Sequence, residues 1–109
     1  MELFKLSDLK GGWFAGNFEP TLHKTSDFEV AVKQYKKYDY EKRHYHKIAT
    51  EFTVIVYGEV RMNNIKYEAG DVVRIDPGEA TDFYVLSDIA ITTVLKTPSV
   101  ANDKYISEN

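Results

Sequence analysis

Short segments rich in β-branched and aromatic residues follow one another along almost the whole chain, and turn-forming residues separate them. No eleven-residue window shows the sustained apolar period of three to four that an amphipathic helix needs. We expect strands over residues 28–38, 51–57, 71–75, 83–86 and 89–95. Strands separated by turns at this interval predict an all-β fold, an antiparallel β-barrel or jelly roll, and not a parallel sheet with helices.

Two segments add detail to this prediction. Residues 28–38 alternate between two sets of side chains, which is typical of a half-buried strand, whereas residues 51–57 are nearly all apolar or β-branched and are expected to be covered on both faces. Asn63 and Asn64 tolerate the left-handed backbone of a two-residue turn, so a tight hairpin is expected there.

The chain has 109 residues, a length that predicts one domain with one core. We expect the barrel core at about residues 28–96, preceded by an N-terminal arm over residues 1–27. Residues 97–109 are polar and are expected to form a loosely attached C-terminal tail.

Composition excludes several classes of function. The absence of cysteine removes disulfides, thiolate catalysis and zinc–thiolate sites. The formal net charge of −3 argues against binding to a nucleic-acid backbone, and we interpret the Lys- and Tyr-rich span 33–47 as a solvated rim or a cradle for a nucleotide-linked ligand. No apolar run has the length of a membrane span, and the first residues lack a secretory pattern. We therefore expect a cytoplasmic protein with no membrane partner.

The pattern H-x-H-x4-E-x6-G, from His44 through His46 and Glu51 to Gly58, contains the chemically active side chains. Two histidines two positions apart lie on one face of a strand. Residues 47–50 can turn the chain back, so that Glu51 opens a second strand with its carboxylate beside the imidazoles. The pattern outlines a set of metal ligands.

This spacing resembles the first motif of the cupins, small β-barrels that hold a metal or another ligand in their interior. Residues 70–81 resemble the second cupin motif, which runs from Gly-Asp through a strand to a Pro-Gly turn. The resemblance implies the cupin jelly roll, a double-stranded β-helix. This sequence departs from the pattern at Thr81, where a further histidine ligand is usual, and at Tyr38, where a glycine is usual, so that Asp39 is the expected turn residue.

The resemblance leaves two interpretations of the site open. His44, His46 and Glu51 form a two-histidine, one-carboxylate set that suits Fe(II), Mn(II), Ni(II) or Zn(II). In the second interpretation the barrel holds no metal, and the histidines form hydrogen bonds with Tyr57 or Thr81. Phase counted from Glu51 places Thr53, Ile55 and Tyr57 inside as well.

Residues 43–47, Arg-His-Tyr-His-Lys, also resemble an element of cupin-type isomerases that act on nucleotide-linked keto-sugars. This resemblance implies a metal-independent isomerase or epimerase. His44 and His46 would then act as base and acid, because their unperturbed pKa lies near neutrality. Tyr57 would polarise the carbonyl, and Arg43 or Lys47 would bind the diphosphate.

The remaining alternative is a module that binds a small molecule, such as a sugar, without turning it over. Thr81 favours it, because loss of a usual ligand indicates relaxed demands on the site. In the metal interpretation, Thr81 would at best support a bound water. Phe52, Val54 and Val56 are expected to point outward, and an exposed apolar set of this kind needs cover. Together with the aromatic segment Trp13-Phe14, this predicts a homodimer.

Overall fold

The computed structural model describes residues 1–108, which form β-strands and two short 3-10 helices, η1 (Leu6–Asp8) and η2 (Lys10–Gly12). The strands are β1 (Trp13–Ala15), β2 (Glu29–Lys36), β3 (Tyr40–Tyr45), β4 (Thr50–Tyr57), β5 (Glu59–Met62), β6 (Ile65–Glu68), β7 (Val72–Ile75), β8 (Thr81–Val85), β9 (Ile89–Thr97) and β10 (Tyr105–Ile106). No helix in the described part of the chain is long and apolar enough to cross a membrane.

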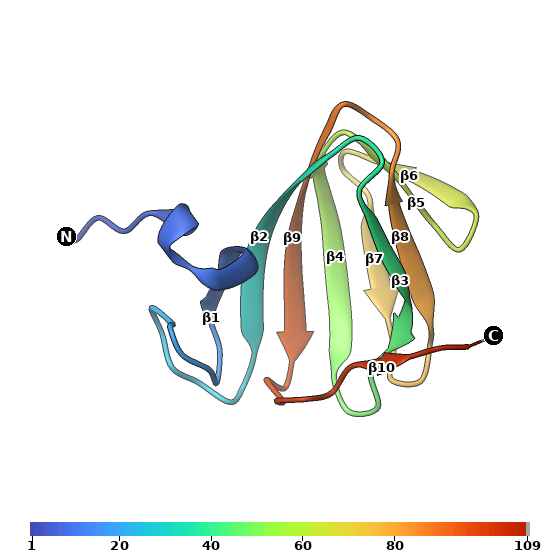
Figure 1. Ribbon diagram of the computed structural model, residues 1–109. Coiled ribbons are helices and arrows are strands. Elements are labelled where there is room, and N and C mark those ends of the chain that lie inside the picture. The colour runs from blue at the N-terminus through green and yellow to red at the C-terminus, as the bar shows by residue number, and fades with distance from the viewer. Residues whose placement is uncertain (109) are drawn as a thin grey trace.

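The strands form two five-stranded sheets that face each other (Figure 1). One sheet has the order β1-β2-β9-β4-β7, the other has the order β10-β3-β8-β5-β6, and all paired strands are antiparallel. The predicted all-β, antiparallel jelly roll is confirmed. The two sheets remain separate and are not closed into a continuous cylinder.

The main apolar core fills one end of the space between the sheets. It is a cluster of buried side chains: Ile55, Val60, Met62, Ile75, Phe83, Val85 and Ala90. Tyr35 packs on this cluster with its ring centroid 4.8 Å from that of Phe83. Met62 and Phe83 of this cluster also line a cavity between the sheets, whose other lining residues are mostly polar or charged.

Strand β4 follows the predicted phase over most of its length. Thr53 and Ile55 point inward and are 3% and 0% exposed. The prediction that Tyr57 also points inward is wrong, because the register with β9 shifts between Ile55 and Tyr57, and Tyr57 is 59% exposed. Strict alternation fails at a β-bulge, which adds one residue to one strand only.

On the outer face of this sheet, cover is incomplete. Phe52 and Val54 are half-buried, but Val56 is 50% exposed and Val72, on the neighbouring strand β7, is 59% exposed. The expectation that residues 51–57 are covered on both faces is therefore not met within the chain itself.

The turns follow local backbone chemistry, with one exception. Asn63 and Asn64 have φ of 50° and 66° and join β5 to β6, which confirms the predicted hairpin. Between β2 and β3, however, Tyr38 takes the left-handed conformation, with φ of 75°, so the prediction that Asp39 makes this turn in its place is wrong. The Asp39 carboxylate accepts a hydrogen bond from the Lys36 N–H instead, which closes the turn around the tyrosine.

The ends of the chain differ in how they attach. The first residues project away from the sheets, with Leu3 80% and Phe4 52% exposed (Figure 1). The last described residues cross one end of the sheets and add β10 to the edge of β3. The prediction of a loosely attached tail over residues 97–109 is wrong for the described part, which ends at residue 108; Asn109 lies outside it.

Candidate functional site

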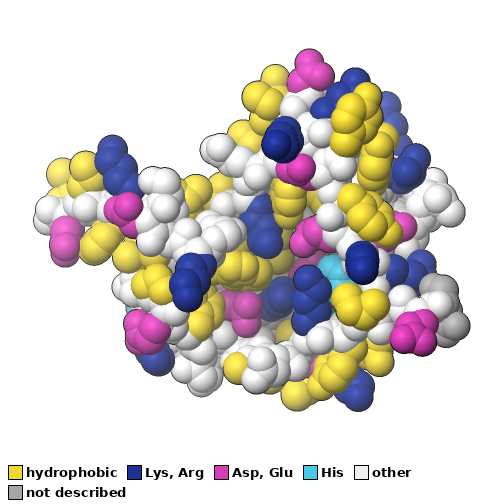
Figure 2. All heavy atoms as spheres, viewed as in Figure 1, with side chains coloured by type: hydrophobic (Ala, Val, Ile, Leu, Met, Phe, Trp, Pro, Cys, Tyr) yellow, Lys and Arg dark blue, Asp and Glu magenta, His cyan; other side chains and the backbone are white. Residues whose placement is uncertain are grey.

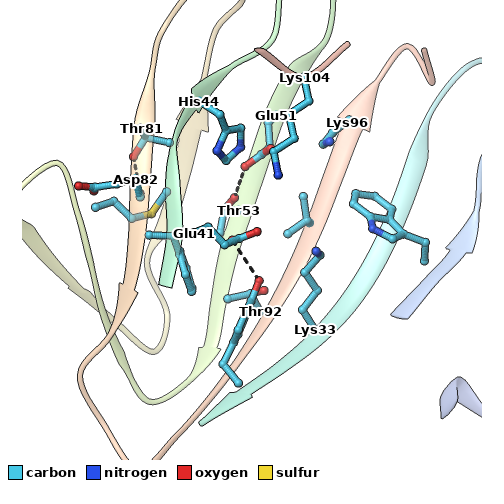
Figure 3. A pocket seen from close by; sticks show the side chains of 15 residues that line it. Lys33, Glu41, His44, Glu51, Thr53, Thr81, Asp82, Thr92, Lys96 and Lys104 are labelled. Atoms are coloured by element: carbon cyan, nitrogen blue, oxygen red, sulfur yellow. Dashed lines mark hydrogen bonds between the residues drawn. The ribbon is translucent and has the colours of Figure 1, made fainter. Parts of the chain in front are cut away.

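A cavity of about 180 Å³ lies between the two sheets (Figure 3). Strands of both sheets and the C-terminal segment contribute to its wall. Its charged and titratable lining side chains include Lys33, Glu41, His44, Glu51, Lys96 and Lys104. In the space-filling view a histidine is visible in a hollow, with basic and acidic side chains gathered around it (Figure 2).

His44 lines this cavity from the end of β3. Its Nδ1 donates a hydrogen bond to the carbonyl oxygen of Lys42 at 2.8 Å, which leaves Nε2 as the lone-pair nitrogen of the neutral ring. Burial lowers the pKa of His44, and the hydrogen bond to Lys42 only partly opposes this. The ring is therefore neutral near pH 7.

His46 occupies a different position from the one predicted. The side chain is 4% exposed, and it does not belong to the cavity wall. Its Nδ1 donates to the carbonyl oxygen of Asp103, and its Nε2 lies 3.3 Å from Oε1 of Glu51. When both nitrogens carry a proton, this contact is a buried ion pair. His46 thus holds Glu51 in place from behind the cavity.

Glu51 presents a carboxylate to the cavity, and its side chain is 12% exposed. Thr53 donates to Oε2 at 2.7 Å, while Oε1 faces His46. Burial by itself raises the pKa of Glu51, but the hydrogen bonds from His46 and Thr53, helped by the charge of Lys96, outweigh it, so that the net direction is downward. The site therefore combines an ionised carboxylate with the neutral imidazole of His44.

Sequence reasoning missed the basic side chains of the cavity. Lys33 on β2 and Lys96 on β9 point inward, with Nζ 5.3 Å and 5.0 Å from the ring centroid of Trp13. Both distances are within cation–π range. The alternation of residues 28–38 contained a signal for Lys33, which shares a phase with the inward Ala31 and Tyr35. Trp13, assigned above to a dimer contact, lines the cavity instead.

The C-terminal segment was missed as well. The buried Asp103 carboxylate accepts hydrogen bonds from the backbone N–H groups of Lys47, Ile48 and Ala49 at 2.9–3.3 Å. The next residue, Lys104, lines the cavity. No pattern in residues 97–109 indicated this role, because the partners lie more than fifty positions away.

The other predicted ligand-binding residues fall into two groups. Thr81 is buried beside His44 on the paired strand β8, but its hydroxyl donates to the Asp82 carbonyl at 2.7 Å. Arg43 instead donates to Asn63 at 2.9 Å, and the Lys47 ammonium lies 4.2 Å from the Tyr105 ring. Neither of these two basic side chains belongs to the cavity wall.

Tyr57 is also outside the cavity, in a shallow surface depression with Gly58 and Glu59. The predicted hydrogen bond from a histidine to Tyr57 is therefore wrong, and both imidazole Nδ1 atoms bind backbone carbonyls instead. The bulge in β4 is the physical reason, because it turns this side chain out of the interior.

The residues present do not fit a divalent metal. Both imidazoles have Nδ1 on a backbone carbonyl, as metal-binding histidines usually do, and their ring centroids are 5.5 Å apart. Nevertheless, within residues 1–108 no group of three His, Asp or Glu side chains could hold a metal ion. Three lysines line the same cavity and would repel a cation.

Solved structures provide the comparison that decides the fold. An uncharacterized conserved protein with a double-stranded β-helix domain from Klebsiella pneumoniae matches with a TM-score of 0.73 and 18% identity, over 98% of this chain and 92% of that one. A sugar phosphate isomerase from a cupin superfamily, from Silicibacter pomeroyi, matches with a TM-score of 0.67 and 22% identity, over 77% of this chain and 59% of that one.

The chain has the cupin fold. The DMSP lyase DddQ from Ruegeria pomeroyi shares this fold, with a TM-score of 0.72 and 17% identity over 87% of this chain, but the chain spans only about half (49%) of the DddQ chain. No family model matches the sequence, and no curated protein matches it. At these sequence identities the similarity shows the fold alone. The function must therefore be inferred from the residues that line the cavity.

Proposed function

We propose that this cupin domain binds a small organic molecule in the cavity between its sheets and does so without a resident metal. The observation that carries the proposal is the joint presentation of a neutral imidazole, His44, and an ionised carboxylate, Glu51, to one cavity. Concave sites with a few convergent polar groups and shifted pKa values are the usual places for ligand binding.

The size of the cavity limits the ligand. Its volume of about 180 Å³ is below the roughly 300–1,000 Å³ of pockets that enclose drug-sized molecules. A sugar nucleotide would have to leave its nucleotide outside, where Arg43 and Lys47 are engaged with Asn63 and Tyr105. A free small molecule is therefore favoured over the nucleotide-linked sugar.

Isomerisation of a small hydroxy-carbonyl compound is the second candidate. Glu51, ionised and held by two hydrogen bonds, can take a proton next to a carbonyl, while a lysine ammonium polarises the carbonyl oxygen. The Nε2 lone pair of His44 can receive the proton of the neighbouring hydroxyl and pass it to the former carbonyl oxygen, while Glu51 returns its proton to the former carbonyl carbon. One similar structure is named a sugar phosphate isomerase, which supports testing this reaction first.

Titration calorimetry distinguishes these proposals from a metal site at His44, His46 and Glu51. The wild type is titrated with small sugars and hydroxy acids, and separately with Fe(II), Mn(II), Ni(II) and Zn(II). We expect organic ligands to bind, His44→Ala to weaken their binding, and chelators to leave it unchanged. Micromolar affinity for a metal, lost in His44→Ala, would contradict the proposal and restore the metal hypothesis.

A homodimer remains our proposal for the outer face of the β1-β2-β9-β4-β7 sheet. The exposed Val56 and Val72, beside the half-buried Phe52 and Val54, form an apolar patch on this face. A second copy of the chain can cover this patch and remove its exposed apolar surface from water. A non-catalytic dimeric binding module stays compatible with this arrangement.

A further inference from the structure

Three ammonium groups converge on the cavity without an acidic partner. Lys33, Lys96 and Lys104 all line it, and none of them forms an ion pair within 4.0 Å with any acid in residues 1–108. Burial lowers the pKa of Lys33, and the charges of Lys96 and Lys104 lower it further, whereas Glu41 and Glu51 oppose this from a distance. The lysines repel one another, and a bound anion would relieve that repulsion.

Trp13 organises two of these groups into a clamp. The Lys33 and Lys96 ammonium groups lie 5.3 Å and 5.0 Å from its ring centroid, one on β2 and one on the adjacent β9. Figure 3 shows both lysines on the sheet that faces His44 and Thr81, with Lys96 beside Glu51. The cavity therefore has a cationic wall in one sheet, called here its cationic end, and a facing wall in the other sheet that carries the imidazole.

We propose that the cationic end, Lys33, Lys96 and Trp13, binds the carboxylate of a small hydroxy acid. This inference rests on the proposed function and names its ligand class. A carboxylate is favoured over a phosphate because no arginine lines the cavity and because Glu41 and Glu51 share the space, which disfavours a second negative charge.

Hydrogen-bonding groups on the cavity wall favour a hydroxyl-bearing ligand over a plain fatty acid. Glu51 and the Nε2 of His44 accept hydrogen bonds. The Thr92 hydroxyl, on a fully buried side chain of the cavity wall, lies beside the Tyr35 hydroxyl and adds a further polar group to this wall. A ligand hydroxyl in the cavity can satisfy these groups, whereas an alkyl chain would leave them unpaired.

Calorimetry with matched probes tests this proposal. The probes are D-glycerate and lactate, with glycerol and lactamide as their uncharged counterparts and inorganic phosphate as the alternative anion. We expect the wild type to bind D-glycerate at least about tenfold more tightly than glycerol, a difference of about 1.4 kcal/mol. Added salt should weaken the binding of the acid and leave that of glycerol unchanged, because only the acid depends on charge.

Lysine variants test which ammonium groups bind the carboxylate. Lys33→Met and Lys96→Met keep an apolar stem in the wall and remove one ammonium each, and each should lower D-glycerate affinity at least about tenfold. Lys36→Met is the matched control, since Lys36 is exposed on the same strand as Lys33, and it should leave the affinity within about twofold. Circular dichroism of each variant establishes that it folds.

The outcomes separate this inference from the proposed function. Equal binding of glycerol and D-glycerate, dependent on His44 and insensitive to salt, overturns the carboxylate clamp and leaves the cavity as a binding site. Tighter binding of inorganic phosphate than of either acid overturns the choice of carboxylate. Absence of binding by every probe overturns both. If Lys33→Met fails to fold, the salt dependence of the wild type and Lys96→Met still decide the question.

Discussion

Asp103→Ala is expected to be strongly destabilising although Asp103 lies outside the main core. The Asp103 carboxylate accepts hydrogen bonds from the backbone of Lys47, Ile48 and Ala49 and joins the C-terminal segment to the β3–β4 turn. Hydrogen bonds to a charged group contribute about 1.5–3 kcal/mol each, but bonds from three donors to one carboxylate are not additive.

Burial of the three donors sets the magnitude. Lys47 and Ile48 are exposed, so water can replace the carboxylate at their N–H groups, whereas Ala49 is 3% exposed and its N–H would remain unpaired. One buried unpaired donor costs about 1–3 kcal/mol, so with the lost charged bonds we expect about 2–4 kcal/mol for Asp103→Ala. Asp103→Asn retains one acceptor oxygen and should cost about half as much.

Urea unfolding followed by circular dichroism measures these values. Asp88→Ala, in the exposed turn between β8 and β9, is the control and should change the free energy of unfolding by less than about 0.5 kcal/mol. An Asp103→Ala variant as stable as this control would refute the argument that the carboxylate joins the two segments. A loss equal in Asn and Ala would show that one neutral acceptor oxygen is not enough and that the full carboxylate is needed at this position.

Four further outcomes are expected. His46→Ala should lower the free energy of unfolding by about 2–4 kcal/mol, because it removes a buried hydrogen-bond partner of Glu51 and Asp103. His44→Ala should mainly lower ligand affinity. Urea unfolding measures the first effect, and calorimetry measures the second. Acid should destabilise the protein, because folding lowers the pKa values of Glu51 and Asp103. The stabilisation from these two carboxylates is complete above their reference pKa values of 4.5 and 3.8 and is lost as pH falls through the folded-state values. A free energy of unfolding that stays constant between pH 6 and pH 3 would contradict this. Gly12→Ala should be far more destabilising than Gly78→Ala. Both glycines have positive φ, but only a Cβ at position 12 would overlap another atom, the Val32 carbonyl oxygen. Equal melting temperatures of the two variants would be inconsistent with that contact. Sedimentation should show a dimer that Val72→Glu converts to monomer, and a wild type that is monomeric at micromolar concentration would remove the proposed interface.

Local sequence determined the strands and part of the site. Side chains alternate with a period of two along any strand, so the inward phase of Thr53 and Ile55 and the hairpin at Asn63 and Asn64 follow from neighbouring residues. The short connection between residues 46 and 50 also kept His44 near Glu51, although β3 and β4 lie in facing sheets and do not pair. These features depend on fewer than ten consecutive residues, and the tertiary structure does not alter them.

Only the tertiary structure determined which polar groups meet in the cavity. The bulge in β4 moves Tyr57 outward, and its position depends on the pairing with β9, a strand more than thirty residues later. The return of the C-terminal segment brings Asp103 against the β3–β4 turn, and that contact in turn orients His46. Such contacts join distant segments, and no local pattern encodes them.

The charge around the cavity also depends on the tertiary structure and differs from the net charge of the chain. By composition the chain is acidic, with a formal net charge of −3, yet the fold gathers Lys33, Lys96 and Lys104 from two strands and the C-terminal segment around one cavity. Net charge sums over the whole surface, whereas a ligand responds to the few groups within a Debye length, about 8–10 Å. The sequence by itself determined a cupin jelly roll with His44 and Glu51 inside, and the tertiary structure determined that their cavity is also cationic, because only folding places these distant ammonium groups side by side.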